Sequence, residues 1–290
     1  MKGIILAGGN GSRLFPVTSV ASKQLLPVYD KPMIYYPLST LMLLGIREIM
    51  IITTPDDISR FEALFGDGSH LGLKLTYEVQ PRPEGIAQAL IIGEEYVNGE
   101  NVALILGDNI FFGDFSSLRA VRDFKNGAMI FAYNVNNPSR YGVIELDDRG
   151  NAISIEEKPK DPKSSFVVTG MYIYSPECVK YARELKLSPR GEYEITDVNR
   201  AFMENGKLQV IKLGRGIAWL DTGTHESMLE AGNFIATIEK RQGLKVACIE
   251  EIAYRMGYID KEKLCGLISK MAENSYRKYL ENLLKEVKGA

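Results

Sequence analysis

The sequence has little cysteine and little histidine: 3 cysteines and 2 histidines among 290 residues. The spacing of Cys178, Cys248 and Cys265 fits neither a zinc site nor a disulfide framework, so we expect reduced thiols. His70 and His225 have no partner at metal-ligand spacing, which argues against a histidine-based metal centre.

Long apolar runs and an excess of basic charge are missing as well. No stretch approaches the length of a transmembrane helix, and the chain opens on a strand-like segment rather than a signal peptide. The formal net charge is -2 with both signs interspersed, unlike the basic footprint of a nucleic-acid-binding protein. We therefore expect a cytoplasmic protein that binds neither membranes nor nucleic acid.

Two apolar patterns alternate along the first part of the chain. Short runs typical of buried strands occupy residues 3–7, 48–53, 73–79 and 102–106. Helical spacing occupies residues 31–45, 57–65 and 86–96. This order predicts an α/β protein with a Rossmann-like three-layer α/β/α fold and a mixed, mostly parallel sheet. Such sheets bind ligands at the carboxyl ends of their strands, so the loops after Leu6, Val79 and Leu106 are of interest.

The second half of the chain changes character twice. Residues 128–219 hold denser strand patterns around a helical segment at 194–205, which predicts an antiparallel or mixed part of the same sheet. From residue 225 onward the chain has helical patterns only. Apolar positions there that one face of the domain would not cover are Ile259, Leu264, Leu267, Ile268 and Met271. Uncovered stripes usually mark a partner surface, although these residues could also pack on their own subunit.

A glycine-rich loop follows the first strand directly. Its glycines let backbone amides approach a polyanion, while hydroxyl, guanidinium and ammonium groups nearby add donors and positive charge. The residues that could hold phosphates in this way are Gly8, Gly9, Gly11, Ser12, Arg13 and Lys23. Together they predict a triphosphate-binding loop, although a tight turn with solvated cations would have the same sequence.

The loop departs from two known phosphate-binding motifs. It lacks the Gly-Lys-Ser/Thr of a P-loop, and Leu14 stands where a dinucleotide fingerprint has its third glycine. Residues 51–54, at the end of the second strand, include no acidic side chain for a ribose. An NAD-dependent oxidoreductase is therefore disfavoured.

Several motifs follow one another along nearly the whole chain. They are Gly8-Gly-Asn-Gly-Ser-Arg13, Ser22-Lys-Gln-Leu-Leu-Pro-Val28, Tyr29-Asp-Lys-Pro-Met-Ile-Tyr-Tyr36, Leu106-Gly-Asp-Asn109, Arg140-Tyr-Gly-Val143, Glu156-Glu-Lys-Pro159, Thr169-Gly170, Gly191-Glu-Tyr-Glu-Ile-Thr-Asp197 and Trp219-Leu-Asp-Thr-Gly-Thr224. This ordered set closely resembles the sugar-1-phosphate nucleotidylyltransferases. The resemblance implies dTTP and glucose 1-phosphate as substrates, with Arg13, Lys23, Asp108 and Lys158 in catalysis.

Two aspartates are candidates for metal binding. Asp108 follows an apolar strand, and Asp221 lies where a second strand would end, just after Trp219, which we expect in the core. Carboxylates at strand ends can hold Mg²⁺ together with substrate phosphates, although an aspartate there often caps the next helix. The resemblance assigns both carboxylates to Mg²⁺.

The resemblance also divides the substrate site into two ends. Gln80, with its amide, and Gly85, with its backbone, can read a pyrimidine edge, which implies thymine or uracil. Lys158 is implied to hold the sugar phosphate and Glu157 the sugar hydroxyls, although a Glu-Lys dipeptide is usually an exposed ion pair. The sugar site that the resemblance implies comprises Asn109, Tyr141, Gly142, Glu157, Lys158, Val168 and Glu192.

For the whole chain we expect a catalytic core over residues 1–224 and a helical section over 225–290 that serves assembly and regulation. The core would bind the nucleotide through about 1–110 and the sugar through about 111–224. Similar enzymes form homotetramers inhibited by a dTDP-sugar at a subunit interface, and the residues resembling that site are Gly113, Arg215, Glu251, Ile252 and Arg255. UTP or another hexose 1-phosphate remains an alternative substrate, and a nucleotide-sugar-binding regulator without turnover an alternative function.

Overall fold

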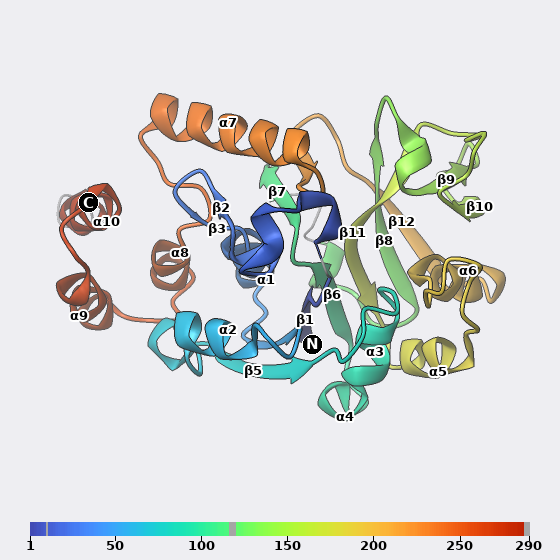
Figure 1. The fold of residues 1–290 in the computed structure, drawn as a ribbon, viewed down its shortest axis with the longest axis horizontal. Coiled ribbons are helices and arrows are strands. Elements are labelled where there is room, and N and C mark those ends of the chain that lie inside the picture. Colours follow the sequence, from blue (N-terminus) through green and yellow to red (C-terminus); the bar gives the residue numbers. More distant parts are fainter. Residues whose placement is uncertain (10, 116–119, 287–290) are drawn as a thin grey trace.

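The computed structural model describes residues 1–9, 11–115 and 120–286, so Asn10 of the glycine loop and residues 287–290 lie outside the described residues. A 9-stranded sheet forms the centre of the molecule (Figure 1). Its strands are β1 (Lys2–Ala7), β4 (Glu48–Thr53), β5 (Lys74–Val79), β6 (Val102–Leu106), β8 (Ala128–Asn134), β9 (Gly142–Leu146), β10 (Ala152–Glu157), β11 (Phe166–Tyr174) and β12 (Leu208–Lys212). The main order is β10-β9-β11-β6-β1-β4-β5, and β8 pairs with both β11 and β12.

The half of the sheet formed by β6, β1, β4 and β5 is parallel; β6, β1 and β4 are buried on both faces, whereas the edge strand β5 is partly exposed. Alternate residues of β1 enter different cores: Ile5 and Ala7 join one apolar cluster, and Ile4 and Leu6 join another. Strands covered on both faces read as continuous apolar runs, which explains why these segments were recognisable in the sequence. The predicted three-layer arrangement with a mixed sheet is confirmed.

Helices supply the two outer layers (Figure 1). The first apolar cluster includes residues of α1 (Tyr35–Leu43), α2 (Ile58–Phe65), α8 (Ile249–Arg255), α9 (Lys261–Lys270) and α10 (Ser275–Glu286). The second includes residues of α3 (Gln88–Ile92), α4 (Glu94–Val97), α5 (Glu177–Glu184) and α6 (Ile195–Glu204). The long α7 (His225–Gln242) packs on a third, smaller apolar cluster. The 3₁₀ helices of the described residues are η1 (Ser12–Leu14), η2 (Val17–Ser19), η3 (Lys23–Leu25), η4 (Ser69–Leu71) and η6 (Pro138–Arg140).

The predicted antiparallel part of the sheet is built around β11. This strand pairs with β8 along one edge; along the other edge it pairs with β9 at Val167 and with β6 from Met171 to Tyr174. Gly170 therefore lies where one edge of β11 passes from β9 to β6. Two small sheets stand apart, β2 (Pro27–Val28) with β3 (Lys31–Pro32) and β7 (Asn109–Gly113) with β13 (Ile217–Asp221). The second of these sets Asp221 opposite Asn109.

Two predicted helices differ from those observed. Helix α1 begins at Tyr35 rather than at residue 31, because a residue that precedes proline avoids helical backbone angles and Lys31-Pro32 forms β3 instead. The predicted helix 86–96 is divided at Gly93 into α3 and α4. A Cβ on Gly93 would lie 2.7 Å from Cδ1 of Ile4, so the glycine permits close packing on β1.

The expectation of uncovered apolar stripes in the C-terminal helices is wrong. Ile259, Leu264 and Ile268 are buried in the same cluster as the sheet, and Leu267 and Met271 pack against it. These positions pack against other residues of their own chain, so they give no support for a partner surface. Within the described ranges, no helix is both long and apolar enough to cross a membrane.

This packing can be tested by truncating Leu264, which is fully buried on α9. We expect Leu264→Ala to lower the free energy of unfolding by about 2–5 kcal/mol, because the cavity left in a packed core adds to the lost burial. The control, Leu229→Ala on α7, removes a leucine that is 66% exposed and should change the value by less than about 0.5 kcal/mol. Urea unfolding followed by circular dichroism measures the free energy of unfolding of both variants. An equally small change in the two variants would contradict the burial of Leu264 in the shared core.

Candidate active site

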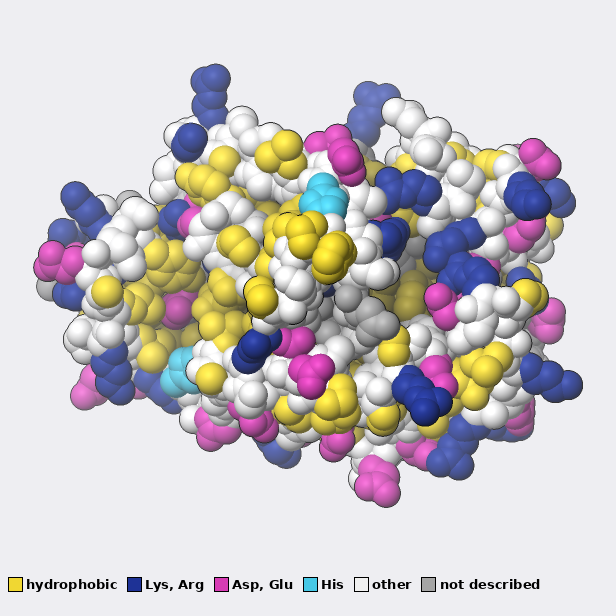
Figure 2. Space-filling view, in the orientation of Figure 1, with side chains coloured by type: hydrophobic (Ala, Val, Ile, Leu, Met, Phe, Trp, Pro, Cys, Tyr) yellow, Lys and Arg dark blue, Asp and Glu magenta, His cyan; other side chains and the backbone are white. Residues whose placement is uncertain are grey.

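A cavity of about 320 Å³ lies at the carboxyl ends of the parallel strands, in the size range of small-molecule sites. Lys and Arg side chains gather around a hollow to the right of the centre in Figure 2. The predicted site residues that line the cavity are Gly9, Arg13, Lys23, Gln80, Gly85, Asp108, Asn109, Tyr141, Gly142, Glu157, Lys158, Val168, Glu192 and Asp221. The structure thus brings together nearly all residues that the sequence motifs singled out, from segments far apart in the chain.

Asp108 directly follows β6 and carries a compensated negative charge. Lys23, from η3, donates a hydrogen bond to Oδ2, and the amide of Asn109 donates to Oδ1 over 3.0 Å. Burial by itself would raise the pKa of Asp108, but the charge and hydrogen bond of Lys23, together with the hydrogen bond from Asn109, hold the pKa below its ordinary value. The carboxylate is therefore ionised and already paired.

Asp221 ends β13 opposite Asn109, and it lines the same cavity as Asp108, which immediately precedes β7. Burial raises the pKa of Asp221, and the negative charge of Asp108 raises it further, against the opposing pull of nearby cations. One of these cations is Arg140, whose Nη2 lies 3.8 Å from Oδ2 of Asp221. Two neighbouring carboxylates offer the oxygen ligands that Mg²⁺ prefers. Among the described residues, no group of three or more acidic, His or Cys side chains could hold a metal by itself. A divalent ion here would take its remaining ligands from phosphates and water.

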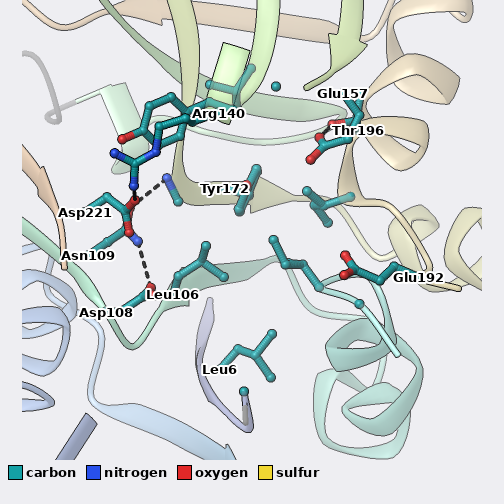
Figure 3. A pocket seen from close by; sticks show the side chains of 18 of the residues that line it. Leu6, Leu106, Asp108, Asn109, Arg140, Glu157, Tyr172, Glu192, Thr196 and Asp221 are labelled. Carbon is teal, nitrogen blue, oxygen red and sulfur yellow. Dashed lines mark hydrogen bonds and ion pairs between the residues drawn. The ribbon is translucent and has the colours of Figure 1, made fainter. Parts of the chain in front are cut away.

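The side chain of Asn109 lies beside Asp108 and Asp221 and is itself held by hydrogen bonds (Figure 3). Its Oδ1 accepts hydrogen bonds from the indole Nε1 of Trp219 over 2.6 Å and from the backbone amide of Gly170 over 3.1 Å. A Cβ on Gly170 would lie 2.5 Å from that oxygen, so the contact requires glycine. Trp219 is buried, as expected for a core residue, but it also lines the cavity and fixes the orientation of Asn109.

The glycine loop closes one side of the cavity. Gly8 lies directly under Gln80, because a Cβ on Gly8 would be 2.1 Å from Oε1 of that side chain. Gly11 has left-handed backbone angles and precedes η1. A Cβ on Gly223 would be 3.1 Å from Nη2 of Arg13 and 3.1 Å from Oδ1 of Asp221, which places the Arg13 guanidinium beside the carboxylates. Gly8, Gly11 and Ser12 shape this loop without lining the cavity.

Gln80 is held in a fixed orientation at the nucleotide end. Its side chain is buried, and Nε2 lies 2.6 Å from Oε1 of Gln88 and 3.5 Å from the carbonyl of Gly85. Gln88 is in turn bonded to the side chain of Glu84 over 2.9 Å. A side-chain amide locked by such a chain presents one hydrogen-bonding pattern rather than several, which is what reading a base edge requires.

Glu157 and Lys158 line the cavity on the side opposite the glycine loop, and Figure 3 shows Glu157 beside Thr196. Thr196 donates a hydrogen bond to Glu157, and Arg190 lies 3.4 Å from the other carboxylate oxygen. Lys158 Nζ is 3.6 Å from Glu157, and its backbone amide donates to the carbonyl of Tyr141 over 3.0 Å. The Glu-Lys ion pair that the dipeptide suggested is present, and it lies inside the cavity.

Several lining residues were not predicted from the sequence. They are Leu6, Gln24, Pro83, Ile86, Leu106, Arg140, Gly170, Tyr172, Ile195, Thr196, Asn199 and Trp219. Most of them stand inside motifs that were recognised for a neighbouring residue, so the motif itself was the signal that could have found them. Val168, Gly170 and Tyr172 of β11 all line the cavity, although the register of β11 shifts between Val168 and Tyr172.

The residues that resemble a regulatory site lie in two places. Gly113 ends β7, where it pairs with Ile217, and the exposed Arg215 stands two residues before that partner. Glu251, Ile252 and Arg255 lie on α8. Both oxygens of Glu251 are engaged: Oε1 accepts from Arg255 over 2.7 Å and Oε2 from Tyr279 over 2.6 Å.

The fold and this arrangement of carboxylates, cations and a glycine loop define a nucleotide-processing enzyme, and comparison agrees. The chain belongs to the nucleotidyl transferase family, whose model matches residues 2–238. The family recognised from the ordered motifs is thereby confirmed.

Several relatives of high similarity share almost the full length. A glucose-1-phosphate thymidylyltransferase of Neisseria meningitidis serogroup A is 56% identical over 288 residues, which cover 99% of this chain and 100% of the relative. One of Mycobacterium tuberculosis is 54% identical over 286 residues, with 98% and 99% covered. A putative glucose-1-phosphate thymidylyltransferase from Bacillus anthracis, solved in complex with a sucrose, matches at a TM-score of 0.75 and 43% identity, covering 81% of this chain and 94% of the other.

The close contact at Gly170 generates a prediction. Gly170→Ala should push Asn109 away and misalign Asp108, lowering turnover at least about tenfold and stability by about 1–3 kcal/mol, the usual cost of overpacking. The control, Gly266→Ala in α9, has open space around it and should keep turnover and add about 0.5–1 kcal/mol of stability. Steady-state kinetics and thermal unfolding measure both; parental turnover in Gly170→Ala would show that the Asn109 contact is dispensable.

Proposed function

We propose that the protein transfers a thymidylyl group from dTTP to α-D-glucose 1-phosphate and releases pyrophosphate. One observation carries the proposal: a single cavity joins a locked amide, Gln80, to the Glu157–Lys158 pair across two convergent carboxylates. The base, the phosphates and the sugar each meet side chains of matching chemistry along that path. The names of the full-length relatives support the same substrates.

The reaction needs positioning more than proton transfer. An oxygen of the sugar phosphate attacks the α-phosphorus of dTTP, the bond to the β-phosphate breaks, and pyrophosphate leaves. The attacking group is already an anion, so no general base is required. Lys158 holds the sugar phosphate in line, and Arg13 and Lys23 stabilise charge that develops on the transferred and leaving phosphates. Glu157 accepts hydrogen bonds from sugar hydroxyls, with Asn109, Tyr141, Gly142, Val168 and Glu192 completing that pocket.

Asp108 and Asp221 would hold Mg²⁺ in this proposal. Asp108 is buried and Asp221 partly buried, and the unfavourable proximity of their charges is what a divalent cation would relieve. When bound, the ion neutralises phosphate charge and polarises the phosphoryl oxygens.

The proposal extends to assembly and regulation. Residues 1–224 form the catalytic core, since every lining residue of the cavity lies between Leu6 and Asp221. The section 225–290 serves a homo-oligomer, a tetramer by family resemblance, with a dTDP-sugar inhibitor bound near Gly113, Arg215, Glu251, Ile252 and Arg255. Arginines of this set suit a diphosphate, because a guanidinium can bind phosphate oxygens in pairs. The cytoplasmic location expected from the sequence stays a prediction.

A matrix of nucleoside triphosphates against hexose 1-phosphates tests the function through pyrophosphate release with Mg²⁺. We expect dTTP with glucose 1-phosphate to be the best pair and purine triphosphates to fail by about 10⁴-fold, because a purine edge does not match the hydrogen-bonding pattern in which Gln80 is locked. UTP lacks only the methyl group, worth about 1–3 kcal/mol, and should be used less well. Efficient turnover of ATP or GTP would refute the pyrimidine assignment, and no turnover with any pair would refute the enzyme.

The regulatory proposal predicts a variant with selective behaviour. Arg255→Ala should weaken inhibition by a dTDP-sugar about tenfold or more, because a charged hydrogen bond to the diphosphate is lost, while kcat and KM for dTTP stay near parental. The exposed Arg241 at the end of α7 provides the matched control, and Arg241→Ala should keep parental inhibition. Unchanged inhibition in Arg255→Ala, or a monomer by light scattering at assay concentration, would remove this part of the proposal.

A further inference from the structure

Arg140 stands at the rim of the cavity with no role in the reaction described so far. It ends η6, just before β9, and its side chain is 40% exposed. The guanidinium reaches towards Asp221, as Figure 3 shows, and its Cζ lies 5.8 Å from the ring centroid of Tyr141. The aromatic ring and the carboxylate together hold the guanidinium over the carboxylate region.

Each carboxylate at the proposed metal position forms one ion pair within 4 Å among the described residues, while Lys23 and Arg13 also act on Asp221 from a longer distance. The two close pairs differ. Lys23 is bonded to Asp108, and its side chain is 12% exposed, so it is fixed in the wall of the cavity. Arg140 lies 3.8 Å from Asp221, beyond hydrogen-bond distance, and much of its side chain faces solvent. A loose, partly exposed ion pair contributes little to stability and separates easily. Arg140 is therefore the cation that can leave.

A divalent cation bound by Asp108 and Asp221 would use the Asp221 oxygens that Arg140 now neutralises. Two cations cannot both approach one carboxylate without mutual repulsion, so binding of the metal disfavours the Arg140–Asp221 pair. A guanidinium released at this place would lie at the phosphate end of the cavity, and its planar set of donors suits phosphate oxygens.

We propose that Arg140 is an exchangeable counter-ion of Asp221: it neutralises that carboxylate until the divalent cation binds, and then moves to the phosphates of the nucleotide. The inference rests on the proposed function, in which Asp108 and Asp221 hold the metal. It differs from a purely structural role in one respect. Substitution of Arg140 should tighten metal binding by the free protein and slow the reaction. Substitution of a residue with a purely structural role would weaken metal binding and slow the reaction.

The test measures Mn²⁺ binding to the free, full-length protein by electron paramagnetic resonance, without nucleotide or sugar phosphate. We expect Arg140→Ala to bind Mn²⁺ about two- to fivefold more tightly than the parent, the scale of a partly exposed ion pair that no longer competes. In the same variant, kcat/KM for dTTP in Mg²⁺-dependent pyrophosphate release should fall about tenfold or more. Arg140→Lys keeps the charge and should bind Mn²⁺ close to the parental value.

Matched variants separate this effect from general charge and from failure of the proposed function. Arg149→Ala removes an exposed arginine from the turn between β9 and β10 and should leave both Mn²⁺ binding and turnover unchanged. Asp221→Asn should weaken Mn²⁺ binding, and the tightening caused by Arg140→Ala should vanish in the double variant. Weaker or unchanged Mn²⁺ binding in Arg140→Ala overturns the inference while pyrophosphate release by the parent still supports the proposed function. Parental Mn²⁺ binding in Asp221→Asn overturns the inference together with the metal assignment.

Discussion

Two carboxylates, the buried Asp108 and the partly buried Asp221, stand close enough for the charge of Asp108 to raise the pKa of Asp221. Like charges in such a place are tolerated only where cations and hydrogen bonds compensate them. For Asp108 the surrounding structure supplies this compensation through hydrogen bonds from Lys23 and from the Asn109 amide. Much of the local architecture serves that arrangement, because the β7–β13 ladder brings Asp221 to Asn109, and Trp219 and Gly170 then fix Asn109.

The two halves of the sheet have separate tasks around that centre. The parallel half contributes the glycine loop and Gln80 at strand ends, while β9, β10, β11 and α6 contribute the opposite side with Glu157, Lys158 and Thr196. A strand that exchanges partners, β11, connects the halves at the level of Asn109. Reactants held by different halves of one rigid sheet meet at a fixed distance and angle, which suits a reaction that depends on alignment.

The C-terminal helices belong to the same hydrophobic core as the sheet. Leu264 and Ile268 of α9 and Leu280 of α10 share one apolar cluster with Ile5 of β1. In Figure 1 these helices lie at the end of the molecule away from β9 and β10, so they cover the sheet without reaching the sugar end of the cavity. Any effect of this section on catalysis would have to pass through the shared core or through another subunit.

By itself the sequence determined the layer pattern, the family and most of the lining residues. Buried parallel strands are continuous apolar runs, and functional residues cluster at their ends, so both leave local signals. Only the tertiary structure decided the features that depend on contacts between segments far apart in the sequence. Whether the apolar stripe of α9 meets a partner or its own chain depends on packing between distant segments, and here neighbouring helices of the same chain cover it. The pairing of Asp221 with Arg140, and the second role of Trp219 as a donor to Asn109, arise from strands that meet only after the chain has folded.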